Sequence, residues 1–312
     1  MGLQPRWPLS YKKQDDHAKG GAKHRVPFFQ DNGIFFIKSG YLMKRNFLSY
    51  FTLFLFLAAF VCQEAACLAA DGAQKKPSPD EALTMLKDGN KRFVEGRLLH
   101  PHSGAARLKQ AGTESQNDYA YATVLTCSDS RVPPEMIFDA GIMDIFVVRV
   151  AGNICDADEI GSIEYGLAHV RTPVLVVLGH TQCGAVTAAT EAVEGKGHAL
   201  EKNIHQLVDN IEPAVKRAKA AHPELKGDAL VEAAIEENVW QAIDHLFMKS
   251  HATRELVKKG QTKVIGAIYD VGTGKVNWLP EAKVQELLKK AEVSPGAAKE
   301  SMTPGSGHEG RH

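Results

Sequence analysis

Three residue types with metal and acid–base chemistry stand close together in the segment TCSDSRVP, which runs from Thr126 to Pro133. Cys127, Asp129 and Arg131 alternate along it, so in an extended chain their side chains point to the same side. A thiolate ligates metals, a carboxylate accepts hydrogen bonds or binds the same metal, and a guanidinium holds a carboxylate. This spacing indicates a metal centre with an acid beside it.

A second group of candidate ligands follows in GHTQCGA, which contains His180 and Cys183. Thiolate and imidazole ligands together favour zinc, and three protein ligands leave the fourth position open, as in catalytic zinc sites. Taken singly, a Cys at the end of a strand is more often a small apolar core residue than a ligand. Taken together, the two segments predict a zinc site made of Cys127, His180 and Cys183.

The segments that must position these ligands have the composition of buried strands. Continuous β-branched and apolar runs are typical of parallel strands that are covered on both faces. We predict strands in YATVLTC (121–127), DIFVVRV (144–150), PVLVVLGH (173–180) and KVIGAIYDV (263–271), with an edge strand in GKVNWL (274–279). Between them, helical periods predict helices at about 79–95, 160–170, 200–221 and 227–259, and one that starts near Ala185.

Strands that alternate with helices predict an α/β fold with a mainly parallel central sheet flanked by helices. In such sheets, sites lie beyond the carboxyl ends of the strands. Cys127 ends the first predicted strand and His180 ends the third. The two ligands therefore meet if these strands are neighbours in the sheet.

The composition narrows the classes of function. Lys plus Arg and Asp plus Glu are both 37, so the formal net charge is zero and no nucleic-acid partner is expected. Of the five cysteines, Cys62 and Cys67 fall in an N-terminal segment that we expect to be removed. The three that remain do not make a disulfide framework. Cys155 has no His near it in the sequence and is predicted to be a free structural thiol.

The N-terminal segment has the order of a secretory signal peptide over residues 43–70. Lys44 and Arg45 precede an uncharged apolar run from Phe47 to Cys62, and small residues follow. This run is shorter than the ~20 residues of a comfortable membrane span, so we expect a periplasmic or secreted protein without a stable span, a retained anchor being the alternative. A signal peptide stands at a terminus, so Met43 is the expected translation start, and residues 1–42 receive no fold assignment.

At the other end, residues 293–312 are rich in Pro, Gly and Ser and are predicted to be a disordered tail. Ser78 and Pro79, followed by acids, are typical of a helix start. The predicted catalytic domain therefore spans residues 76–292.

The paired segments CSDSR and HTQCG resemble the motifs of the β-class carbonic anhydrases. The resemblance extends over about residues 80–285, through ALTMLKDGNKRFVEG, FVVRVAGN, ENVWQAIDHL and KVIGAIYDVGTGKVNWL. It implies a β-carbonic anhydrase-like fold, a zinc lyase that interconverts CO2 and bicarbonate, and a homodimer or higher homo-oligomer.

Carried over residue by residue, the resemblance makes Cys127, His180 and Cys183 the zinc ligands, with Asp129 and Arg131 as a catalytic dyad. It implies that zinc lowers the pKa of bound water to roughly 7, and that the resulting hydroxide attacks CO2. Asp129 would orient that hydroxide. Arg131 would hold Asp129 off the metal by a charge-assisted contact.

Substrate contacts follow the family pattern less closely. Gly184 follows the last ligand and would offer a backbone N–H to a substrate oxygen. The family's substrate-binding Gln, nine residues before the first ligand, is replaced here by Asp118, and we assign the role to Gln116.

Some bacterial relatives have a regulatory bicarbonate pocket built from Trp, Arg and Tyr. Arg149 and Tyr165 match two of its residues, but Val124 stands in the place of the Trp. We therefore expect a site that is open without such regulation.

Two other functions fit parts of the same pattern. A hydrolase of carbonyl sulfide or carbon disulfide would need almost the same zinc chemistry. A non-catalytic zinc-binding or redox-sensing protein would need the ligands but not Asp129 and Arg131. The presence of this pair favours the enzyme.

Overall fold

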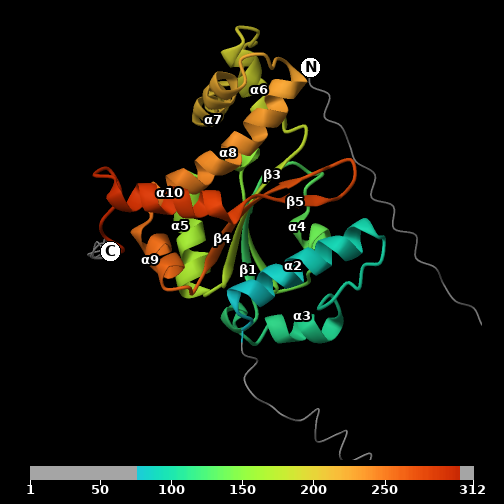
Figure 1. Ribbon diagram of the computed structural model, residues 1–312. Helices are drawn as coiled ribbons and strands as arrows, with labels where there is room; N and C mark the ends of the chain where they lie inside the picture. Colours follow the sequence, from blue (N-terminus) through green and yellow to red (C-terminus); the bar gives the residue numbers. More distant parts are fainter. Residues whose placement is uncertain (1–75, 303–312) are drawn as a thin grey trace, which may run out of the picture. The chain divides into compact units, whose positions relative to one another are not determined.

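The computed structural model describes residues 76–302, which form a five-stranded sheet with helices on both faces (Figure 1). The strand order is β2-β1-β3-β4-β5, in which the first four strands are parallel and β5 is antiparallel to β4. The strands are β1 (Ala122–Thr126), β2 (Ile145–Arg149), β3 (Val174–His180), β4 (Lys263–Tyr269) and β5 (Val276–Trp278). The α/β fold with a mainly parallel central sheet is therefore confirmed, and each strand lies in its predicted segment.

Both faces of the sheet are buried, as the unbroken apolar runs of the strands require. On one face, Leu125, Leu175 and Val264 pack with residues of α5 (Ala157–Glu164), α8 (Asp228–Lys249) and α10 (Glu281–Val293). On the other face, Val124 and Val176 pack with α2 (Pro79–Val94) and α4 (Pro134–Ile137). The central strands β1 and β3 are thus fixed from both sides.

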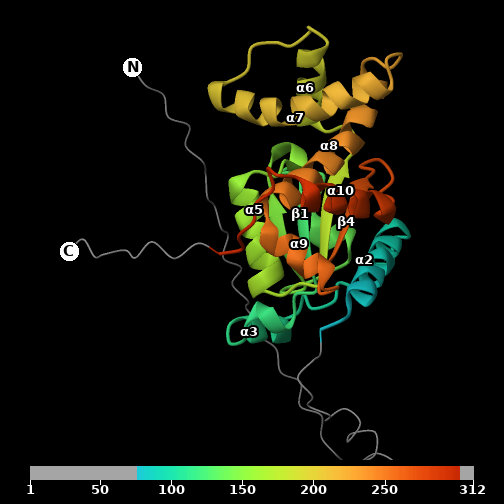
Figure 2. The same cartoon turned by 60° about the vertical axis from the view of Figure 1, so that its left-hand side comes forward.

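A third apolar cluster lies past the carboxyl ends of the strands. It joins α6 (Gly184–Val193), α7 (Lys202–Ala221) and the start of α8, and it includes Cys127 and Cys183. Figure 2 shows α6 and α7 side by side at one end of the molecule, beyond the sheet. The remaining short elements are α3 (Ala105–Ala111), α9 (His251–Lys258), η1 (Gln116–Asp118), η2 (Ala151–Asn153) and η3 (Tyr165–His169).

The predicted helix over 227–259 is wrong in one respect, because the structure divides it into α8 and α9 at Ser250. The Ser250 hydroxyl accepts the backbone N–H of Thr253, which is the bond of an N-cap. Ser250 is completely buried. Hydrophobic periodicity continues across the break, so the sequence pattern alone did not reveal it.

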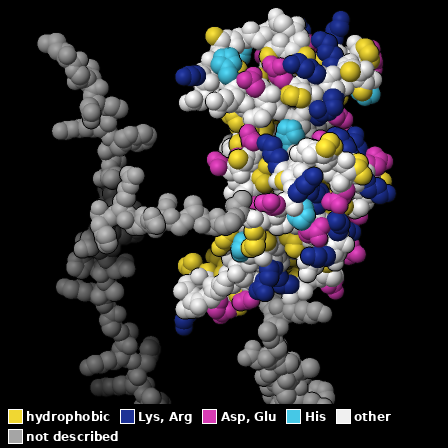
Figure 3. Space-filling view, turned by 90° about the vertical axis from the view of Figure 1, so that its left-hand side faces the viewer, with side chains coloured by type: hydrophobic (Ala, Val, Ile, Leu, Met, Phe, Trp, Pro, Cys, Tyr) yellow, Lys and Arg dark blue, Asp and Glu magenta, His cyan; other side chains and the backbone are white. Residues whose placement is uncertain are grey.

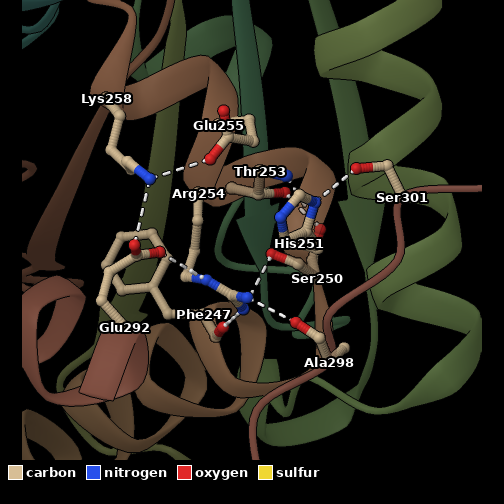
Figure 4. Close-up of polar contacts among 10 residues, drawn as sticks. All are labelled: Phe247, Ser250, His251, Thr253, Arg254, Glu255, Lys258, Glu292, Ala298 and Ser301. Carbon is tan, nitrogen blue, oxygen red and sulfur yellow. Dashed lines mark hydrogen bonds and ion pairs between the residues drawn. The ribbon is translucent and has the colours of Figure 1, made fainter. Parts of the chain in front are cut away.

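The C-terminal segment is ordered further than its composition indicates. Residues 294–302 follow α10 and turn back onto the helices, where the N–H of Ala298 donates to the carbonyl of Met248 at 2.8 Å. The buried guanidinium of Arg254 donates to the carbonyls of Phe247 and Ala298, and His251 contacts Ser301 (Figure 4). The prediction of a disordered tail is therefore wrong for residues 294–302.

The predictions for residues 1–42, for the signal peptide at 43–70 and for 303–312 fall outside the described residues. Within residues 76–302, none of the helices has the length and apolar character needed to cross a membrane. Figure 3 shows Lys and Arg interspersed with Asp and Glu on the face that it draws.

Candidate metal centre

Neighbouring strands bring the three predicted ligands together. Cys127 directly follows β1, and His180 is the last residue of β3. These strands are parallel neighbours, with Thr126 opposite Leu178, so their carboxyl ends lie at the same edge of the sheet. Cys183 is the N-cap of α6, the helix that leaves this edge. The ligand atoms of Cys127, His180 and Cys183 all lie within 4.8 Å of one another, and all three residues are buried.

The imidazole of His180 is oriented for a metal. Its Nδ1 lies 2.9 Å from the carbonyl of Thr181, and a carbonyl oxygen only accepts, so Nδ1 carries the proton and Nε2 has a free lone pair. Nε2 is buried and has no hydrogen-bond partner. An unsatisfied buried acceptor costs about 1–3 kcal/mol. A cation between this nitrogen and the two sulfurs would remove that cost.

The two thiols have opposite pKa shifts because they face each other. The pKa of Cys127 is lowered to about 4, chiefly because the Cys183 thiol donates a hydrogen bond to its sulfur. The pKa of Cys183 is raised, because its thiol donates this hydrogen bond to Cys127, because the group is buried and because a second thiolate would face the first. Both residues are free cysteines. The pair therefore holds one negative charge alone, whereas a divalent metal would stabilise two. Two sulfurs and one imidazole nitrogen are a donor set that zinc prefers.

Arg131 holds the acid beside this group. Its Nε lies 3.0 Å from Oδ1 of Asp129, and its Nη2 lies 2.8 Å from Oδ2. This bidentate contact lowers the pKa of Asp129 well below its usual range, so the group is a carboxylate at every working pH. Nη1 and Nη2 of Arg131 also donate to the side-chain and backbone oxygens of Gln182, at 3.2 and 3.0 Å. One side chain thus joins the loops that carry the ligands.

The predicted substrate contacts have different outcomes. Gly184 begins α6, is exposed, and has no atom within 4 Å of the place where a Cβ would stand, so there is open space beside Cys183. Gln116 lies in η1, which precedes β1. It is therefore at the amino end of the strand whose carboxyl end carries Cys127, and a single chain does not bring the two together.

Three further residues support the centre, and motif reasoning did not assign them this role. Arg149 donates to the carbonyls of Cys127 and Asp129, at 3.1 and 2.7 Å. The N–H of Gly152 donates to Sγ of Cys127 at 3.3 Å, and Asn238 donates to the carbonyl of Gly152. The resemblance of FVVRVAGN and ENVWQAIDHL was the only sequence signal for these contacts, and it carried no geometry.

The other residues considered for the site lie elsewhere. Tyr165 packs against Phe146 and His169, and Val124 is part of the core on the α2 face. Cys155 is buried in the opposite core cluster, where desolvation raises its pKa to about 12. Its prediction as a free structural thiol is confirmed.

Comparisons with known proteins agree with this geometry. The family model described as carbonic anhydrase matches residues 122–276. A carbonic anhydrase of Mycolicibacterium smegmatis is 35% identical over 64% of this chain and 92% of its own length. Carbonic anhydrase 2 of Mycobacterium tuberculosis H37Rv is 34% identical over 64% of this chain and 91% of its own.

Solved structures give the same result for the fold. The β-carbonic anhydrase CafA of Aspergillus fumigatus matches 68% of this chain and 97% of its own, with a TM-score of 0.50 and 26% identity. The β-carbonic anhydrase CcaA matches 64% of this chain and 96% of its own, with a TM-score of 0.50 and 23% identity, which shows the fold alone.

Proposed function

The chain belongs to the β-class carbonic anhydrase family, and we propose that it hydrates CO2 reversibly with zinc held by Cys127, His180 and Cys183. The observation that carries the choice of site is the buried, unpartnered Nε2 of His180, which lies within 4.8 Å of two thiol sulfurs. When bound, zinc with three protein ligands supplies a Lewis acid with an open position and makes a nucleophile from water near neutral pH.

The residues of the dyad divide the work of orientation. Asp129 is an acceptor only, since its carboxylate stays ionised, and it can accept a hydrogen bond from the attacking water and so set the direction of the oxygen lone pair. Arg131 occupies both carboxylate oxygens from one side. This contact keeps Asp129 from becoming a further metal ligand, which would fill the position that the reaction needs.

Gly184 is the proposed contact to the substrate oxygen. It is the first residue of α6, where backbone N–H groups have no partner within the helix and the helix dipole favours negative charge. As CO2 becomes bicarbonate, negative charge grows on the substrate oxygens. A donor at this position therefore stabilises the product side and the transition state more than neutral CO2.

Two assays on the purified protein test this function against its alternatives. Stopped-flow measurement should show CO2 hydration, and the same preparation should release little sulfide from carbonyl sulfide. Cys183→Ala should abolish the hydration, because it removes a metal ligand. Rapid sulfide release with slow hydration would identify a carbonyl sulfide hydrolase instead. A zinc-bound protein without either activity would be a binding or sensing protein.

We propose a homodimer that pairs through β2. This strand is at the edge of the sheet, and its first three residues are only partly covered. Tyr165, beside Phe146 of this strand, is 51% exposed. An open edge with apolar side chains favours pairing with another chain. A partner would also be the source of Gln116 at the site. Sedimentation equilibrium should give the dimer mass, and a fully active monomer would contradict the proposal.

Export to the periplasm or outside the cell is proposed from the segment 43–70. N-terminal sequencing of the protein from its native cells should find a start near residues 70–73. A mature chain that still carries Phe47 to Val61 would show a membrane anchor instead.

A further inference from the structure

We propose that Asn238 is a positioning residue of the metal centre, although it is on α8 and its recorded hydrogen bond goes to Gly152 and not to a ligand. It would act through Gly152, whose backbone connects Asn238 to the sulfur of Cys127. The inference rests on the proposed metal site. It concerns how the thiolate of Cys127 is kept pointing toward the metal.

The connection consists of two hydrogen bonds on either side of one residue. Nδ2 of Asn238 donates to the carbonyl of Gly152 at 2.7 Å, and the N–H of Gly152 donates to Sγ of Cys127 at 3.3 Å. These two groups flank the Cα of Gly152, so a fixed carbonyl restricts the rotation between them. Asn238 thus limits the directions in which the N–H can point.

Gly152 can be held only through its backbone. Its φ is +72°, in the left-handed region, and a Cβ there would lie 2.6 Å from Cδ1 of Ile211 and 3.1 Å from Cβ of Ala185. The backbone of η2 at Gly152 therefore packs closely against α6 and α7 and has no room for a side chain. Other residues can hold Gly152 only by hydrogen bonds to its backbone, and Asn238 makes such a bond to its carbonyl.

The burial of Asn238 supports a role for its hydrogen bond to Gly152. The side chain is 1% exposed and lies on α8 between Ile235 and Val239, which contact the sheet. A buried amide costs free energy unless it is hydrogen-bonded, and an apolar residue would pack here at lower cost. Its donor goes to the loop beside the metal centre. An N–H donor to a metal-binding thiolate stabilises its charge and fixes its orientation.

The test replaces the spectroscopically silent zinc by Co²⁺, whose thiolate complexes have a sulfur-to-cobalt charge-transfer band. In Asn238→Leu, the Gly152 N–H loses its fixed direction, and the Cys127 sulfur loses stabilisation. Its lone pairs rise in energy, so the band should move to longer wavelength. Zinc affinity, measured by competition with a chelator, should fall roughly 10- to 100-fold, as for other residues that orient metal ligands.

Asn90→Leu is the matched control. Asn90 is also buried, and its amide donates to the carbonyls of Ile137 and Gly274, where α2 packs on the sheet. This variant should lose stability, yet its cobalt band and zinc affinity should equal those of the wild type. If Asn238→Leu does not fold, Asn238→Ala removes the same donor with a smaller side chain and should move the band in the same direction.

Gly152→Ala tests the connection itself. A methyl group at Gly152 displaces the same N–H, so this variant should also move the band to longer wavelength. In the double variant with Asn238→Leu, the second change should add little, because both act on one hydrogen bond to Cys127. Shifts that add in full would mean that the two residues act separately.

The outcomes separate this inference from the proposed function. A wild-type protein that binds Co²⁺ without a sulfur-to-cobalt band would show that the proposed metal site is wrong. A wild-type protein with the band, and an Asn238→Leu variant with the same band and the same zinc affinity, would leave the metal site intact and overturn the role of Asn238.

Discussion

The guanidinium of Arg131 meets the carboxylate of Asp129 with two parallel contacts, of 3.0 and 2.8 Å, although only one residue separates them in the sequence. The backbone N–H of Arg131 donates to the same carboxylate at 2.9 Å. All three contacts to the carboxylate come from one residue, so the direction of the carboxylate depends on Arg131, whereas Arg149 holds the backbone carbonyl of Asp129. A residue with positive charge but without the planar fork would hold the acid poorly.

Arg131→Lys should therefore keep the metal and lose most of the CO2 hydration activity. Lys supplies charge but not two parallel donors, and the freed Asp129 would turn toward the metal. Metal content by mass spectrometry of the native protein and stopped-flow rates check both parts. The double variant Arg131→Lys with Asp129→Ala should free the open position again, with turnover still low for want of the acceptor. A crystal structure of Arg131→Lys with Asp129 in its native place, and near-native activity, would contradict the prediction.

The metal content should depend on the thiols of the centre and not on burial of a thiol as such. Purified protein should contain about one zinc per chain, and Cys183→Ala should lose most of it, because it removes one of three ligands. Cys155→Ala is the control, since Cys155 is equally buried and free but lies in another cluster, and it should keep its zinc. Full zinc in a Cys127 and Cys183 double variant would show that the metal binds elsewhere.

Asp139 should make stability depend on pH at the acid end. Burial raises the pKa of Asp139, but the contact of 2.6 Å with Arg92 and the N–H groups of Leu99 and His100 outweigh this, and the pKa is lowered. A carboxyl whose pKa is lowered by folding stabilises the fold above its unfolded pKa of about 3.9, and this contribution is lost as the pH falls. Asp139→Asn should cost about 2 kcal/mol at pH 7.

Urea unfolding between pH 3 and 7 checks this, and the difference between wild type and Asp139→Asn should narrow as the pH falls below about 4. Asp118→Asn is the control. Asp118 is exposed and lies 3.7 Å from Arg171, so its loss should change stability by less than about 1 kcal/mol. If the difference in unfolding free energy between Asp139→Asn and the wild type is constant over the whole pH range, the charge of Asp139 is not what stabilises the fold.

Arg254 should determine whether the segment after α10 stays on the helices. Its buried guanidinium donates to the carbonyls of Phe247 and Ala298 and to Glu292 (Figure 4). Arg254→Met would leave the carbonyl groups without their donor, at a cost of about 3 kcal/mol, and proteases should cut after Val293 more readily. Lys258→Met is the matched control, because Lys258 contacts the same Glu292 from a more exposed position and should cost less than about 1 kcal/mol. Equal losses in both variants would refute this role of Arg254.

The sheet and the ligand set could be read from the sequence because each depends on a local pattern. Buried parallel strands are continuous apolar runs, and a ligand at the end of a run is at the end of a strand. Cys127 and His180 needed only the further assumption that β1 and β3 are neighbours, which the structure confirms.

The residues that hold the ligands in place could not be found in this way. Asn238 and Gly152 are 86 residues apart, and nothing in either segment refers to the other. The break at Ser250 depends on a single hydroxyl that caps α9, and the fold of residues 294–302 depends on a buried arginine in a distant helix. Such contacts follow from the packing of the whole domain. The composition of each segment does not indicate which distant residue it contacts.

The order in which the ribosome makes the chain affects when the protein can bind its metal. Cys127, His180 and Cys183 all leave the ribosome before Asn238, and before β4, which pairs with β3 along its whole length from Val174 to His180. A nascent chain that already contains all three ligands still lacks β4, which pairs with β3, the strand that carries His180. Metal binding draws on folding. The complete metal site therefore forms only where the segment from Asn238 through β4 folds, and the metal must be available to the chain at that place.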